Sequence, residues 1–204
     1  MRGAARQGPW TTAGPVGDNP AMAAPRRGTT QTVTINRAPV LTLWAAVVAE
    51  RLGYDRDEAV TLGRAVAGFG AAAKARRLGI AERREKPALE KTPKAAKPGA
   101  RVEVALCGLR IPAIRTADGL RATSKDKPTA PESVHRYLES KFGDTLADVR
   151  AAMAALARSR SADELASGAF GLYESFRPAI PAGVRGWGAQ GVLDLAAIRA
   201  LASR

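Results

Sequence analysis

The sequence is poor in several residue types on which enzymes and extracellular proteins depend. It holds one cysteine, Cys107, and one histidine, His135. A single cysteine excludes an intramolecular disulfide and a multi-cysteine zinc site, and it fits a reducing compartment. A single histidine excludes any mechanism that needs two imidazoles. Aromatic residues make up only 5% of the chain, so we expect a core filled mainly by Ala, Val and Leu.

Long apolar runs and catalytic motifs are also missing. No stretch approaches the roughly 20 apolar residues of a membrane-spanning helix, and the N-terminus lacks the apolar core of a secretory signal. We therefore expect a cytoplasmic protein with no membrane association. The absence of metal-ligand spacing and of a catalytic signature predicts a non-enzymatic protein without metal or cofactor, although a site assembled from distant residues would leave no such signal.

Positive charge is present in excess, and it is unevenly distributed. The net charge is +13, and the segment Lys74 to Lys127 carries 15 basic against six acidic residues. The segment Pro128 to Arg204, in contrast, carries nine basic against eight acidic residues. A basic zone of this kind attracts polyanions, because each phosphate that it neutralises releases counterions.

Two helices are predicted over residues 36–80. Pro39 suits the first position of a helix, and the apolar residues that follow recur at the spacing of one helix face. Gly53 ends this helix in a left-handed cap. Asp55 and Glu58 form a capping box for a second helix that starts near Arg56. Its glycines, Gly63, Gly68 and Gly70, suggest that another backbone approaches closely.

Part of this hairpin fits the helix-turn-helix motif of DNA-binding proteins. Ala49, Gly53 and Leu62 lie where that motif places a small residue, its turn glycine and a core residue. The second helix, however, opens with Asp57 and Glu58, and DNA phosphates repel such charges. We therefore expect ordinary helix packing here rather than base reading.

The middle of the chain changes from a charged connector to alternating strands. Residues 81–100 are rich in Lys and Pro, and residues 92–99 resemble the tails of linker histones in composition. From Arg101 the apolar residues alternate, which predicts a three-stranded meander with a two-residue turn at Cys107-Gly108. Pro112 is expected to mark an edge or a bulge where the alternation slips.

Helices are predicted over most of the remaining chain. One helix is expected from Pro131 to Phe142, and the next is expected to be capped by Asp144. Ser161 and Glu164 form a capping box for a third helix. A last helix is expected from about Val192. Residues 186–191 match the dinucleotide fingerprint G-x-G-x-x-G, but the strand before, the helix after and the distant acid that this fold needs do not fit.

The predicted fold class is mainly α with a small antiparallel β-meander (α+β): an N-terminal helical hairpin, a three-stranded meander and a C-terminal helical bundle. The chain is predicted to divide into a disordered tail over 1–35, the hairpin over 36–80, a basic connector over 81–100, the meander over 101–122 and C-terminal helices over 123–204.

Two functions follow as hypotheses. The first is a non-enzymatic nucleic-acid-associated protein, with DNA favoured over RNA, that contacts phosphates without sequence choice. The second is a protein–protein interaction or scaffold module, in which the basic connector is only a linker; a homo-oligomer fits either hypothesis. The candidate phosphate-binding residues are the basic side chains Lys74, Arg76, Arg77, Arg83, Arg84, Lys86, Lys91, Lys94, Lys97, Arg101, Arg110, Arg115 and Arg121.

Overall fold

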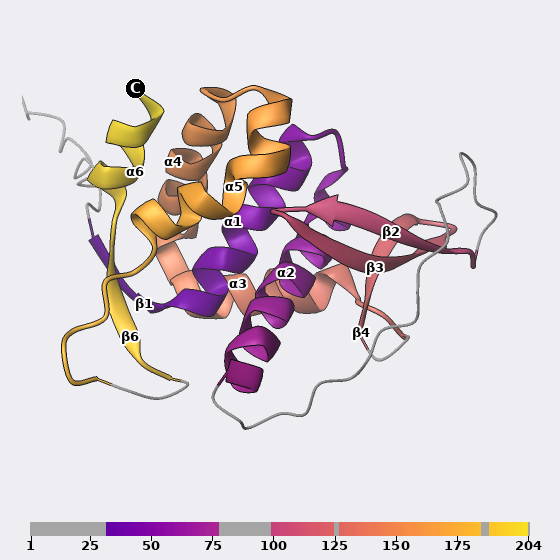
Figure 1. Ribbon diagram of the computed structural model, residues 1–204, viewed down its shortest axis with the longest axis horizontal. Helices are drawn as coiled ribbons and strands as arrows, with labels where there is room; N and C mark the ends of the chain where they lie inside the picture. Colours follow the sequence, from indigo (N-terminus) through magenta and orange to yellow (C-terminus); the bar gives the residue numbers. More distant parts are fainter. Residues whose placement is uncertain (1–31, 78–98, 125–126, 185–187, 204) are drawn as a thin grey trace, which may run out of the picture.

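The computed structural model describes residues 32–77, 99–124, 127–184 and 188–203, without the side chains of residues 71–77. The chain combines helices with two antiparallel sheets (Figure 1), so the expected mixed α+β class is confirmed. In chain order the elements are β1 (Thr32–Asn36), α1 (Arg37–Arg51), α2 (Arg56–Arg77), β2 (Arg101–Leu106), β3 (Leu109–Thr116), β4 (Gly119–Ser124), β5 (Lys127–Pro128), α3 (Pro131–Phe142), the 3-10 turn η1 (Gly143–Thr145), α4 (Leu146–Arg158), α5 (Ala162–Phe176), β6 (Gln190–Asp194) and α6 (Leu195–Ala202).

Helix α1 is the centre of the molecule. Every residue from Pro39 to Ala49 is buried, so the helix is covered on all sides rather than on the single face that its spacing predicts. Helices α2, α4 and α5 surround it. The indole of Trp44 donates a 2.8 Å hydrogen bond to the carbonyl of Ala169 in α5, and its ring meets Phe176 edge-on at 5.3 Å.

Three helix boundaries were predicted well, because their signals are local. Gly53 follows the end of α1 with a φ of +99°. The backbone N–H of Glu58 donates to the Asp55 carboxylate at 2.8 Å, as the capping box requires. Ser161 and Glu164 form the second predicted box at the start of α5.

Other boundaries differ from the expectation. Helix α1 begins at Arg37, so Pro39 is its third residue. Asp144 lies in η1 and does not cap α4; the helix follows Thr145 without a side-chain cap. Gln190–Asp194 is a strand, and the last helix begins only at Leu195, where the Asp194 carboxylate accepts from the N–H of Ala196 at 2.8 Å.

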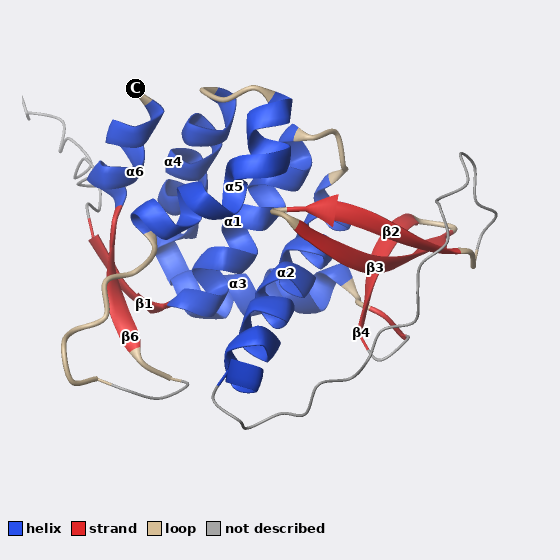
Figure 2. Cartoon of the chain, viewed as in Figure 1, coloured by secondary structure: helices blue, strands red, loops and turns tan. Residues whose placement is uncertain are grey.

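The two sheets lie at opposite ends of the helical body (Figure 2). Strands β2, β3, β4 and β5 form one sheet in that order, one strand more than the predicted meander. Strands β1 and β6 form the other, with Thr32 opposite Asp194 and Asn36 opposite Gln190. The predicted tail over 1–35 is therefore wrong for residues 32–35, because Ile35 is buried and its strand pairs with the C-terminal region.

Candidate nucleic-acid interface

The register of the four-stranded sheet decides which predicted arginines share a face. Arg101 pairs with Ile114, and Ile114 pairs with Arg121. Paired residues on antiparallel strands project to the same side, so Arg101 and Arg121 share one face. Arg110 lies on the same face, because its partner Ala105 is four residues beyond Arg101. Arg115 alternates to the opposite face. We call the first side the outer face; its residues are Arg101, Glu103, Ala105, Arg110, Pro112, Ile114, Arg121 and Thr123.

Pro112 does not shift this register, contrary to the sequence-based expectation. It pairs directly with Glu103, and Ile111 and Ala113 on either side of it are both buried. The alternation therefore continues through the proline without a bulge. The turn at Cys107-Gly108 is as predicted, with positive φ at both residues, the combination of a type I′ hairpin turn.

The opposite, inner face of the sheet and the backbone of β4 are attached to α2. The N–H of Leu120 donates to the Glu58 carboxylate at 2.6 Å, and the N–H of Ala122 donates to the Thr61 hydroxyl at 3.1 Å. Two backbone donors of β4 are thus satisfied by side chains of the helix. The sheet is held in a fixed position, with its outer face directed away from this contact.

The four sheet arginines differ in how far they reach solvent. The Arg110 side chain is 73% exposed, with its guanidinium 3.6 Å from the Glu103 carboxylate. Arg101 and Arg115 are exposed as well. Arg121 is the exception, because it is only 7% exposed and donates to the carbonyl of Leu120. The candidate phosphate-binding residue Arg121 is therefore mostly covered by the fold.

The C-terminal end of the basic connector is hydrogen-bonded to strand β3 of this sheet. The N–H of Gly99 donates to the Arg115 carbonyl at 2.6 Å, and the Arg115 N–H donates to the Ala100 carbonyl at 3.2 Å. Lys74, Arg76 and Arg77 belong to the last turns of α2. The remaining candidates lie outside the described residues: Arg83, Arg84, Lys86, Lys91, Lys94 and Lys97.

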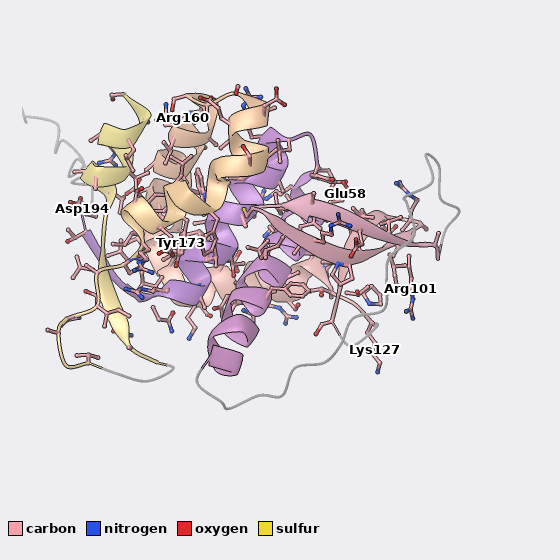
Figure 3. All side chains as sticks on the ribbon, in the orientation of Figure 1. Glu58, Arg101, Lys127, Arg160, Tyr173 and Asp194 are labelled. Carbon is pink, nitrogen blue, oxygen red and sulfur yellow. The ribbon has the colours of Figure 1, made fainter. Side chains whose placement is uncertain are left out.

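Two further cations near the sheet and α2 were missed from the sequence. Lys127 is exposed in β5 and pairs with Ser124 (Figure 3); it ends the basic segment from Lys74 but is not among the sequence-based candidates. Arg64 is exposed on α2, with its guanidinium carbon 4.5 Å from the ring centre of Tyr137 in α3. No local pattern predicts that contact, since the two helices are far apart in sequence.

The helix pair does not have the geometry of a DNA-reading helix-turn-helix. Gly63 lies against Thr42 and Ala46, well away from the turn at Gly53, so α2 packs along α1. The first turns of α2 are in contact with β4 through Glu58 and Thr61. A recognition helix must leave this part free to enter the major groove. The expectation of ordinary helix packing agrees with this geometry.

The single cysteine and the single histidine of the chain both lie within the described residues. Burial raises the pKa of the Cys107 thiol to about 12, which leaves almost no reactive thiolate at neutral pH. The His135 ring lies 3.2 Å from the Asp57 carboxylate at the surface, between α3 and α2. No group of three or more His, Cys, Asp or Glu residues in the described ranges is arranged to hold a metal ion.

Comparison with known proteins found no matching family model, curated protein or solved structure. Within the described part of the chain, every helix is too short or too polar to cross a membrane.

Proposed function

We propose that this protein binds the phosphate backbone of nucleic acid, without sequence choice and without catalysis, through the basic connector and the exposed arginines of the four-stranded sheet. The observation that carries the proposal is the attachment of the connector to the sheet. The hydrogen bonds between Gly99, Ala100 and Arg115 place the end of the connector directly beside Arg101. The described end of the connector therefore belongs to the sheet that carries Arg101 and Arg110.

The charge distribution favours this region over the C-terminal part of the chain. The segment from Lys74 to Lys127 has 15 basic and six acidic residues, whereas the chain beyond it is nearly balanced. Helices α4 and α6 lie at the end of the molecule opposite the four-stranded sheet (Figure 1). In the ion pair between Arg110 and Glu103, the Arg110 side chain is 73% exposed and its guanidinium lies 3.6 Å from the carboxylate. Ion pairs that solvent reaches are weak, about 0–1 kcal/mol, so phosphate can compete with the carboxylate for Arg110.

The test is a salt titration with labelled duplex DNA and RNA. Affinity is expected to fall linearly on a log–log plot with salt, with a slope of roughly −0.9 for each phosphate neutralised. Replacing Lys91, Lys94 and Lys97 by Gln, or Arg101 and Arg110 by Gln, is expected to weaken binding. The same variants should reduce the magnitude of that slope by about one for each phosphate that the protein no longer neutralises.

The matched control removes two arginines from the other end of the molecule. Arg158→Gln with Arg199→Gln changes the net charge by the same amount as the sheet pair but acts on α4 and α6. This control is expected to retain the parent slope. An equal reduction of the slope in the control would show that only net charge matters, and absence of binding at low salt would overturn the proposal in favour of the scaffold alternative.

A further inference from the structure

Helix α5 has an uncharged middle, although one side of it faces solvent. It lies in front of α1 in Figure 2 and packs on it with its buried side. The stretch from Leu165 to Tyr173 contains no charged residue. Its exposed members are Ala166, Ser167, Gly168, Phe170 and Gly171. The outward side of a surface helix normally carries charged and polar residues, so this side of α5 is unusual for a helix that meets only water.

Phe170 lies near the centre of this side. Among the described residues it is the aromatic side chain most open to solvent, with 39% of it exposed. A Cβ added at Gly168 or Gly171 would meet nothing within 4 Å, so the packing within this chain requires glycine at neither position. Glycine destabilises a helix interior relative to alanine, and it allows another backbone to approach closely. An aromatic side chain and two bare glycines therefore form a surface that suits a second helix.

The charges at the two ends of α5 are placed symmetrically about Phe170. Asp163 lies seven residues before it in the first turn, and Arg177 lies seven residues after it, directly beyond the last turn. Seven residues are close to two full turns, so the three positions lie along one side of the helix. If two copies of α5 pack antiparallel with a twofold axis at Phe170, the Asp163 of each copy lies opposite the Arg177 of the other.

We propose that the exposed side of α5 is a contact surface between two copies of this chain, which pack as an antiparallel pair of helices. Such a twofold contact uses the same surface on both copies. The two Phe170 rings then meet at the axis, where aromatic pairs are favourable, and an ion pair between Asp163 and Arg177 lies at each end. The Arg177 guanidinium is 2.6 Å from Glu174, and its side chain is 41% exposed. A guanidinium has five N–H donors, so it can accept a second carboxylate partner.

Sedimentation equilibrium of the full chain, freed of nucleic acid, measures the association. One helix side per copy is a small interface, so we expect a reversible dimer with a dissociation constant in the micromolar range. Phe170→Ala is expected to weaken the dimer on the order of tenfold or more, because the ring is lost from both copies at the centre of the contact. Glu139→Arg reverses an exposed charge on α3 and is the control, with the parent constant expected.

Exchanging the end charges tests the orientation of the two helices. Asp163→Arg places arginine opposite arginine, and Arg177→Asp places aspartate opposite aspartate, so each variant alone is expected to associate more weakly by on the order of tenfold. An equal mixture of the two variants pairs every arginine with an aspartate and is expected to recover the dimer. Mixing cannot repair a folding defect, so recovery is specific to the contact.

Three outcomes would overturn the inference. They are a parent protein that stays monomeric at every concentration, a dimer that Phe170→Ala does not weaken, and a mixture of the charge variants that does not recover. None of them bears on the binding of nucleic acid, because α5 lies outside the basic segment from Lys74 to Lys127.

Discussion

At the scale of single residues, the glycines of α2 differ sharply in what surrounds them. A Cβ added at Gly63 would lie 2.4 Å from the carbonyl oxygen of Thr42 and 2.8 Å from the backbone nitrogen of Ala46. A Cβ added at Gly68, five residues farther along, would meet nothing within 4 Å. The sequence predicted close approach at both, because composition alone does not show which face of a helix meets a neighbour.

This difference gives a matched pair of substitutions. Gly63→Ala is expected to destabilise the protein by about 1–3 kcal/mol or more, because the backbone of α1 must move to admit the methyl group. Gly68→Ala is expected to stabilise it by roughly 0.5–1 kcal/mol, because Ala restricts the unfolded chain more than Gly does. Urea unfolding of the two variants measures both free energies, and equal effects would contradict the close helix contact.

At the scale of secondary-structure elements, the attachment of α2 to β4 depends on Glu58. Its carboxylate accepts from the N–H of Asp55 at 3.4 Å within the capping box and from the N–H of Leu120 at 2.6 Å across to the sheet. A Cβ at Gly119 would lie 2.7 Å from the same carboxylate, and the φ of this residue is +105°. Helix α2 and strand β4 therefore pack closely against each other at the Glu58 side chain.

Glu58→Ala is expected to destabilise the protein by about 1–3 kcal/mol, because the N–H of Leu120 loses its acceptor in a partly buried position. Glu58→Gln keeps a carbonyl acceptor and is expected to cost less. Amide hydrogen exchange at Leu120 should speed up in the Ala variant by more than in the Gln variant. Glu139→Ala, an exposed position on α3, is the control, and a comparable effect there would refute the specific role of Glu58.

The predicted elements show which signals the sequence carries. Capping boxes, turn glycines and alternating strands act within a few residues, and the boundaries at Gly53, Asp55 and Ser161 followed from them. Strands β1 and β6 were missed because each is short and pairs with a partner from the other end of the described chain. For the candidate site, the sequence predicted which arginines of the sheet are candidates. It did not predict which of them share a face, because that depends on strand register, nor that Arg121 is buried, because that depends on packing.

At the scale of the whole molecule, one hydrophobic core connects the helices with the four-stranded sheet. Val104, Leu106, Cys107 and Ile111 of the sheet region belong to the same cluster as Trp44 in the central helix. The exposed arginines of the four-stranded sheet thus lie on a sheet that shares the core of the helical body. We expect the sheet and the helices to unfold together.

The last prediction tests this common unfolding with two probes. Trp44 reports on the centre once Trp10 and Trp187 are replaced by Phe, and Cys107 reports on the sheet through thiol labelling. At pH 8 the folded protein is expected to label very slowly, because the Cys107 thiol is buried with its pKa raised to about 12 from the ordinary value of 9.0. Unfolding returns this pKa to its ordinary range, so labelling should begin at the urea midpoint given by Trp44 fluorescence. Labelling at clearly lower urea would show that the sheet separates first, in which case the region proposed to bind phosphate has a stability of its own.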